Sequence, residues 1–214
     1  MTVATKICGL NAPEAVAAAA AGARWAGFVF YPRSPRAVTP ERAGRLAALL
    51  PARVGRVAVV VDADDEALRA IVRGLRPDVI QLHGGEDPRR AEAIRRGFGV
   101  QVMKALSVAS AEDLDAADAF VPVVDLFLFD AKPPKTEVDA LPGGNGRAFD
   151  WRLMAGRRWP RPWLLSGGLD LGNVAEAVTI SGAEAVDVST GVEDRPGVKS
   201  PVKIRAFLAA VQAM

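Results

Sequence analysis

The residues best suited to proton chemistry stand at the ends of short apolar runs. Cys8 follows KI in TKICGL, and Asp130 ends LFLFD. At the mouth of a pocket, a thiol can act as a base or a nucleophile if a neighbouring cation or amide dipole keeps its pKa near or below the usual ~8.5. A carboxyl group surrounded by apolar residues is biased towards its protonated form and suits a general acid. His83, at the end of QLH, is a further candidate.

Each of these residues also has a structural interpretation. A lone cysteine is often a small buried hydrophobic residue. Asp130 can cap the loop that follows it or pair with Lys132, and a single histidine is usually a hydrogen-bonded structural residue. No second ligand stands at a metal-binding spacing from His83, so we assign no metal.

Charged residues follow two other apolar runs. Arg33 and Arg36 lie in FYPRSPRAV (residues 30–38), and Asp62 follows RVAVVV. An arginine beside a pocket can hold a carboxylate through two hydrogen bonds, although a solvated loop charge is the ordinary role.

Two late segments are rich in glycine, serine and threonine: LSGGL (residues 165–169) and DVSTGVE (residues 187–193). Small residues let backbone N–H groups approach a phosphate closely, and a pair of such segments on neighbouring strands is typical of a phosphate site. Either segment alone would more often be a plain turn.

All these residues end strands in a regular alternation of short β-type runs and helical segments. The β-type runs are TKIC, WAGFVF, RVAVVV, DVIQLH, VQVMKAL, VVDLFLFD, PWLLSGG and EAVDVS. The last helical segment is PVKIRAFLAAVQ. Apolar strands separated by helices indicate a parallel sheet with both faces covered. Eight units, with no G-x-G-x-x-G after the first strand, favour an α/β fold consisting of a single (β/α)8 TIM barrel over an open doubly wound sheet.

The barrel interpretation assigns a common location to the candidate residues. The site of such a barrel lies at the carboxyl ends of its strands, where the connecting loops converge. One connection, residues 131–151, is long and rich in proline and glycine; one alternative is a lid formed by the 131–149 loop, and the other is a disordered surface insertion. Asp150 is expected to cap the short helix that follows.

Composition sets the remaining limits. The 214 residues are 50% hydrophobic and carry a net charge of +2, which suits one domain over 1–214 and no nucleic-acid partner. One cysteine cannot form an intrachain disulfide, and no leader-like segment or run of eighteen apolar residues is present. We therefore expect a cytoplasmic protein without a membrane partner.

Taken together, these motifs resemble the phosphoribosylanthranilate isomerase family of tryptophan biosynthesis. The matching segments, in order, are KICG, GFVFYPRSPR, QLHG, FDAK, GGNGRAFDW, LSGGL and DVSTGVE. The resemblance implies a (β/α)8 enzyme that performs an Amadori rearrangement of N-(5-phosphoribosyl)anthranilate without a cofactor.

The resemblance also implies residue roles. Cys8 is the expected general base, Asp130 the general acid, and Arg36 the holder of the anthranilate carboxylate. His83 and Asp187, in QLHG and DVSTGVE, are expected to contact the substrate. Phosphate is expected on the two glycine-containing loops, at Gly167, Gly168, Ser189, Thr190 and Gly191.

Two positions depart from the family pattern. Thr190 stands where a second serine is common, and Ser200 stands where an acidic residue often begins the last helix. Two rival functions remain: a related aldose–ketose isomerase of histidine biosynthesis, which would have aspartate in place of Cys8, and a noncatalytic phosphosugar-binding barrel. The protein is expected to be a monomer or a homodimer.

Overall fold

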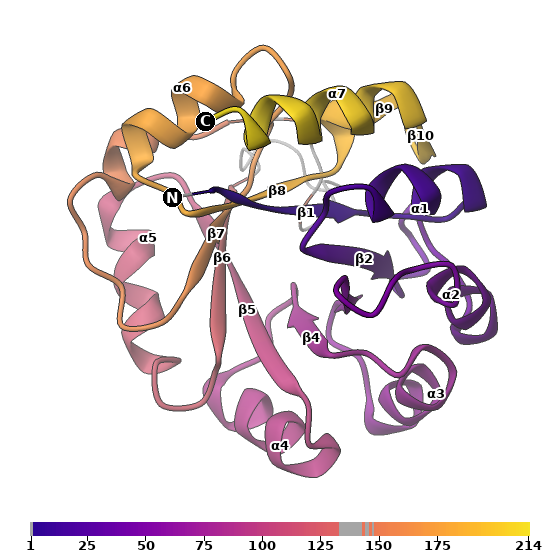
Figure 1. Ribbon diagram of the computed structural model, residues 1–214. Coiled ribbons are helices and arrows are strands. Elements are labelled where there is room, and N and C mark those ends of the chain that lie inside the picture. Colours follow the sequence, from indigo (N-terminus) through magenta and orange to yellow (C-terminus); the bar gives the residue numbers. More distant parts are fainter. Residues whose placement is uncertain (1, 133–142, 144–145, 147) are drawn as a thin grey trace.

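Eight parallel strands close into a barrel with helices around its outside (Figure 1). The computed structural model describes residues 2–132, 143, 146 and 148–214. The barrel strands are β1 (Ala4–Cys8), β2 (Trp25–Val29), β3 (Gly55–Val60), β4 (Val79–Leu82), β5 (Gln101–Val108), β6 (Leu126–Ala131), β7 (Trp163–Leu165) and β8 (Ala185–Val188). The closed barrel confirms the predicted fold class.

The helices follow the predicted rhythm. They are α1 (Pro13–Ala20), α2 (Pro40–Ala47), α3 (Asp65–Leu75), α4 (Pro88–Phe98), α5 (Ala111–Asp115), α6 (Val174–Ser181) and α7 (Pro201–Gln212), with 3-10 turns η1 (Ala116–Ala119), η2 (Trp151–Met154) and η3 (Thr190–Val192). Several begin at a capping side chain, as when Asp64 accepts a hydrogen bond from the Ala67 N–H at 2.8 Å. A hairpin that the sequence analysis did not predict, β9 (Glu193–Arg195) and β10 (Val198–Lys199), lies between β8 and α7.

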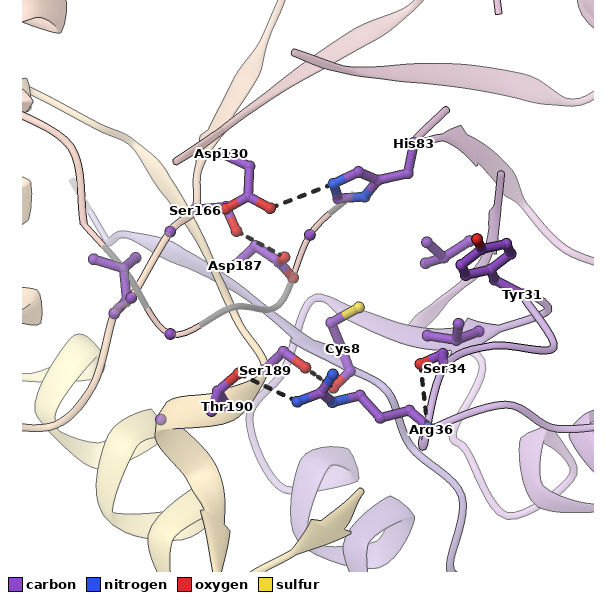
Figure 2. A pocket seen from close by; sticks show the side chains of 18 of the residues that line it. Cys8, Tyr31, Ser34, Arg36, His83, Asp130, Ser166, Asp187, Ser189 and Thr190 are labelled. Carbon is purple, nitrogen blue, oxygen red and sulfur yellow. Dashed lines mark hydrogen bonds and ion pairs between the residues drawn. The ribbon is translucent and has the colours of Figure 1, made fainter. Parts of the chain in front are cut away.

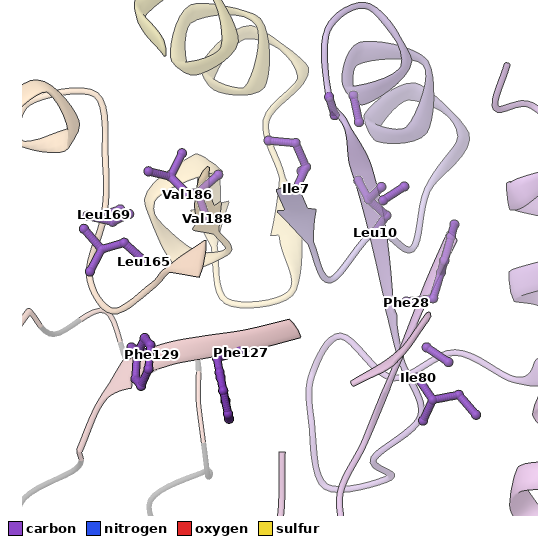
Figure 3. Packing of buried hydrophobic residues seen from close by; sticks show 14 of the residues in the cluster. Ile7, Leu10, Phe28, Ile80, Phe127, Phe129, Leu165, Leu169, Val186 and Val188 are labelled. Carbon is purple, nitrogen blue, oxygen red and sulfur yellow. The ribbon is translucent and has the colours of Figure 1, made fainter. Parts of the chain in front are cut away.

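Alternation along the strands divides the core into two parts. Ile7, Phe28 and Phe127 belong to the larger part, between the barrel and its helices (Figure 3). The smaller part fills the barrel interior and includes Cys8 and Leu128. Neighbouring residues of a strand point to opposite faces, so alternate residues share a face. Because Cys8 points into the barrel, Lys6, two residues before it on β1, also points into the barrel.

Closure depends on β1, which pairs with β2 on one side and with β8 on the other. Ala4, Thr5, Lys6 and Ile7 align with residues 185–188 of β8. Helix α7 packs against both α1 and β1, so it covers this seam. The two strands that end at Cys8 and at the DVST segment are therefore held side by side.

Two local expectations can be compared with the structure. Asp150 caps η2, accepting a hydrogen bond from the Arg152 N–H at 3.1 Å, as predicted. Ser200 occupies the position before α7, yet its side chain makes no capping hydrogen bond. Pro201 begins the helix, where its fixed φ suits the first helical position. The lid predicted over 131–149 falls mostly on residues 133–142, 144, 145 and 147, which lie outside the described residues.

Candidate active site

A pocket opens at the carboxyl ends of the strands, and the side chains around it come from widely separated parts of the chain (Figure 2). Each site residue that the family resemblance implies lies on its wall. The lining includes Cys8, Arg36, His83, Asp130, Gly167, Gly168, Asp187, Ser189, Thr190 and Gly191. The parallel barrel brings them together because all its strands end at the same rim.

Cys8 ends β1 and is 8% exposed. Burial raises the pKa of its thiol, Lys6 and Lys199 lower it, and the Asp187 carboxylate raises it; the net pKa lies above its ordinary value. The sequence named a pKa near or below the usual value only as a condition for base or nucleophile chemistry. The neighbouring cation that it named as favouring the thiolate is present, but burial outweighs that cation.

Asp130 ends the apolar run of β6 and faces His83 across the pocket. The distance from His83 Nε2 to Asp130 Oδ2 is 3.3 Å, while Asp130 Oδ1 accepts a hydrogen bond from the Ala131 N–H at 2.9 Å. Lys132 pairs with Asp113 at 2.6 Å and not with Asp130, contrary to the structural alternative considered for this carboxylate. Asp130 is thus buried with one oxygen facing an imidazole.

The other ring nitrogen of His83 lies 2.8 Å from Nε2 of the fully buried Gln81. With the Gln81 amide in this orientation its nitrogen donates and Nδ1 accepts, so a neutral ring carries its proton on Nε2, the atom that lies 3.3 Å from Asp130 Oδ2. Gly143 backs this pair so closely that a Cβ there would overlap His83 Nε2 and Asp130 Oδ2. Because residue 143 is a glycine, its backbone can lie directly against His83 and Asp130.

Arg36 is buried at 5% exposure and held by Glu193 of β9. Its Nε and Nη2 donate to the two Glu193 carboxylate oxygens at 2.7 and 2.9 Å, and Nη2 also donates to Thr190 Oγ1 at 3.2 Å. Lys199 donates to the same Glu193 at 2.7 Å. One carboxylate thus fixes two cations beside the pocket.

The loops after β7 and β8 meet at their glycines. Gly167 and Gly168 have φ values of 90° and 59°, which side chains disfavour, and a Cβ at Gly191 would overlap the Leu169 carbonyl oxygen. The side-chain amide of Asn173, just before α6, donates to the Gly168 carbonyl at 2.9 Å. Backbone-lined and cationic at its edge, this corner suits an anion.

Asp187 lies deeper than the rim loops. Its carboxylate accepts a hydrogen bond from the Lys6 ammonium at 2.8 Å and another from the Ser166 hydroxyl at 3.2 Å. Asp187 therefore neutralises a buried lysine and also lines the pocket.

Two other candidates from the sequence are not part of the described wall. Asp62 follows β3 in a left-handed conformation, with φ of 48°, and accepts a hydrogen bond from the Gly85 N–H at 2.8 Å. Its own N–H donates to the buried Glu86, which pairs with Lys104 at 3.0 Å. Arg33 is exposed. Asp62 thus serves to join the loops after β3 and β4.

The arrangement offers a thiol, a carboxyl–imidazole pair, a fixed guanidinium and an anion corner around one cavity. Among the described residues, no group of three histidine, cysteine, aspartate or glutamate side chains lies close enough to hold a metal ion. These side chains can donate a proton at one wall and accept one at another while holding a molecule with two anionic ends.

The family model described as N-(5'phosphoribosyl)anthranilate (PRA) isomerase matches residues 5–210. The chain belongs to this family. A PRA isomerase of Rhodospirillum centenum is 55% identical over 215 residues, with 100% of both chains covered. One of Parvibaculum lavamentivorans is 54% identical, with 99% of both chains covered.

Solved PRA isomerase structures share the barrel. The crystal structure of the Thermotoga maritima enzyme is 34% identical and superposes with a TM-score of 0.87, covering 99% of this chain and 100% of that one. Family membership identifies this chain as an isomerase, as its motifs predicted.

Four residues around the PRA isomerase pocket were not identified from the sequence: Lys6, Gln81, Glu193 and Lys199. The first two had a signal, because each is a polar residue at an inward position of an otherwise apolar strand, two residues before Cys8 or His83. Glu193 and Lys199 belong to a short hairpin whose contact with Arg36 crosses 157 residues of chain. Nothing local in the sequence predicts that contact.

Proposed function

We propose that this chain converts N-(5-phosphoribosyl)anthranilate into 1-(2-carboxyphenylamino)-1-deoxyribulose 5-phosphate in tryptophan biosynthesis, with Asp130 as general acid and Cys8 as general base. Asp130 gives a proton to the furanose ring oxygen, and the ring opens to a Schiff base. The Cys8 thiolate then removes the proton from C2′ and an enolamine forms, which tautomerises to the amino ketone. Each proton transfer supplies roughly 10²- to 10⁴-fold of the rate.

Opposition of acid and base across one cavity is the observation that carries this proposal. Cys8 ends β1, Asp130 ends β6, and both line the same pocket. The Nε2–H of His83, directed towards Asp130 Oδ2 at 3.3 Å, would stabilise the carboxylate that remains after the proton has left. His83 therefore acts on the substrate through Asp130, and contact with the sugar is compatible with that position.

Substrate binding follows the distribution of charge. Arg36, held by Glu193, is assigned to the anthranilate carboxylate, since guanidinium and carboxylate geometries match. The phosphate is assigned to the loops of Gly167, Gly168, Ser189, Thr190 and Gly191. Asp187 is assigned to the wall beneath the sugar. A structure of another family member, 32% identical with a TM-score of 0.82, contains reduced 1-(o-carboxyphenylamino)-1-deoxyribulose 5-phosphate.

The decisive experiment supplies freshly made phosphoribosylanthranilate and follows the loss of its anthranilate fluorescence. Cys8→Ser and Asp130→Asn should each lower kcat by about 10²- to 10⁴-fold with little change in the affinity for the product. Asp118→Asn, an exposed carboxylate outside the pocket, serves as the control and should behave like the parent. Parental turnover in Cys8→Ser would require another base.

We also propose a cytoplasmic enzyme that is a monomer or a homodimer. The buried free thiol of Cys8 suits a reducing compartment. Within the described residues, no helix has the length and apolar character needed to cross a bilayer. A related structure contains monomers generated from a dimeric isomerase of Thermotoga maritima. Analytical ultracentrifugation would decide between the two states for this chain.

A further inference from the structure

Resting on the proposed role of Cys8 as a base, we propose that Lys6 is its positioning residue: the Lys6 ammonium, anchored on Asp187 inside the barrel, stabilises the Cys8 thiolate while it removes the substrate proton. Nothing in the acid–base scheme above uses Lys6. A lysine enclosed in a barrel core nevertheless needs a reason to be there, because burying its charge is costly.

The side chain of Lys6 is fully buried directly below the pocket. Lys6 and Cys8 are two residues apart on β1, so both point into the barrel. Lys6 aligns with Asp187 of β8 in the strand register, and its Nζ lies 2.8 Å from Asp187 Oδ1. The same ammonium also acts on the Cys8 thiol, whose pKa it lowers. One cation therefore joins the candidate base to a carboxylate.

Gly27 of β2 gives this cluster its space. It aligns with Cys8 in the register, and a Cβ on it would lie 3.2 Å from Cys8 Sγ and 3.3 Å from Lys6 Cε. Both distances are tighter than ordinary side-chain contacts. Because Gly27 has no side chain, the aliphatic part of Lys6 and the thiol of Cys8 can both pack against β2 at this position.

The charges around Cys8 explain why Lys6 matters. Burial lowers the pKa of Lys6, but Asp187 and Cys8 together raise it by more than burial lowers it. The net pKa of Lys6 therefore lies above the ordinary value and the group stays protonated. Without this cation, the Asp187 carboxylate would oppose a thiolate as a like charge. The second cation near the thiol, Lys199, is bonded to Glu193 at 2.7 Å. Among the described residues, the charged or titratable groups facing Cys8 or its pocket are Lys6, Tyr31, Arg36, His83, Asp130, Asp187, Glu193 and Lys199.

Cys8 is the only cysteine, so its ionisation can be measured directly and without substrate. We would follow the pH dependence of thiolate ultraviolet absorbance and of alkylation by iodoacetamide, with Cys8→Ser as the blank. Lys6→Met should move the midpoint to higher pH by at least about one unit and slow alkylation at neutral pH about tenfold or more. kcat should fall in parallel while KM changes little, because Lys6 acts on the base and not on the substrate.

A second variant separates this role from simple neutralisation of Asp187. Asp187→Asn keeps the cation and removes the like charge, so the thiolate midpoint should move to lower pH. If Lys6 merely balances Asp187, the double variant Lys6→Met/Asp187→Asn should restore the parental midpoint and kcat; we expect both to remain displaced as in Lys6→Met. Lys203→Met, an exposed lysine paired with Asp194, is the control and should titrate like the parent.

The outcomes are separable from those of the proposed function. An unchanged thiolate midpoint in folded Lys6→Met would overturn the Lys6 proposal even if Cys8 is the base. If Lys6→Met does not fold, Lys6→Gln decides the matter: a midpoint shifted to higher pH supports the proposal and an unshifted one overturns it. Conversely, a shifted midpoint together with full activity of Cys8→Ser would leave the charge coupling intact and refute the base.

Discussion

At the scale of single residues, the pocket contains three side chains that are each the only one of their type in the chain. Cys8 is the only cysteine, His83 the only histidine and Tyr31 the only tyrosine, and all three line the cavity. Any thiol or imidazole signal from the intact protein therefore originates in the site. The chemistry can be followed at the two walls separately, the thiol on one side and the carboxyl–imidazole pair on the other.

Gln81 sets the state of the imidazole and allows a test. Its amide nitrogen lies 2.8 Å from Nδ1, so nitrogen NMR of labelled histidine should show the neutral tautomer protonated at Nε2. Gln81→Leu should yield a mixture of tautomers. It should also lower kcat by roughly fivefold, the equivalent of about 1 kcal/mol for one lost hydrogen bond.

Gln101→Leu is a matched control, because Gln101 is exposed on β5 and outside the pocket. It should leave both the tautomer and kcat as in the parent. An Nδ1-protonated ring in the parent protein would contradict the hydrogen-bond assignment and the support that we assign to His83.

At the scale of elements, the β9–β10 hairpin supports the wall that carries Arg36. Glu193 of β9 bonds Arg36 and Lys199, and Lys199 of β10 also donates to the Ser189 carbonyl at 2.9 Å. The hairpin therefore connects the loop after β2 to the loop after β8. Both loops would shift if this connection were lost.

Glu193→Gln should lower the free energy of unfolding on the order of 3–5 kcal/mol, since two buried cations would face a neutral amide. Urea unfolding measures the loss. The matched control is Glu176→Gln, an exposed glutamate of α6, which should change stability by less than about 0.5 kcal/mol.

The same residue should give a pH signature. Burial raises the pKa of Glu193, but bonds from Arg36 and Lys199 lower it more, so its folded pKa lies below the usual 4.5. Its stabilising contribution is therefore complete above pH 4.5 and is lost as the pH falls through the folded pKa. Glu193→Gln should show a shallower loss of stability below pH 4.5 than the parent; an equal slope would contradict the assignment.

The sequence predicted strands and helices well because each has a local cause. Helix α7 spans 201–212 as predicted, where Pro201 starts it, and α3 spans 65–75, where Asp64 caps it. The hairpin escaped prediction because β10 has only two residues and no apolar alternation. The partner of Arg36 escaped with it, since that ion pair depends on the folded path of the chain.

At the scale of the whole molecule, the barrel seam is the structure on which the site depends. Cys8 and the DVST segment end the two strands that meet there, and α7 covers them. Residues such as Phe207 of α7, fully buried, belong to the outer core that holds helix and barrel together. Loosening this helix should therefore affect the chemistry at the opposite rim.

Phe207→Ala should cost about 3–5 kcal/mol of unfolding free energy, the range for truncating a buried aromatic residue. Hydrogen exchange should then rise first in β1 and β8. Val202→Ala, at 69% exposure on the same helix, should stay within about 0.5 kcal/mol of the parent. Unchanged exchange in β1 would show that α7 does not hold the seam.

Barrel topology was predictable because eight alternating units leave few ways to bury apolar strands, and the site location followed from it. The pKa of Cys8 was not predictable in the same way. It depends on burial, on Lys6 two residues away, and on the charges of Asp187 in β8 and Lys199 in β10, and only Lys6 belongs to the local sequence around residue 8. Position could be deduced from the order of strands, whereas electrostatics required the packed interior.

Closure of the sheet into a barrel also determines how far apart Cys8 and Asp130 lie. In a flat sheet with the same strand order, opened between β8 and β1, the strands ending at Cys8 and Asp130 would be five positions apart, roughly 24 Å at about 4.8 Å per strand. A pentose is far too small to bridge that gap. Transplanting this pair of side chains onto a planar scaffold would therefore preserve every residue and abolish the reaction.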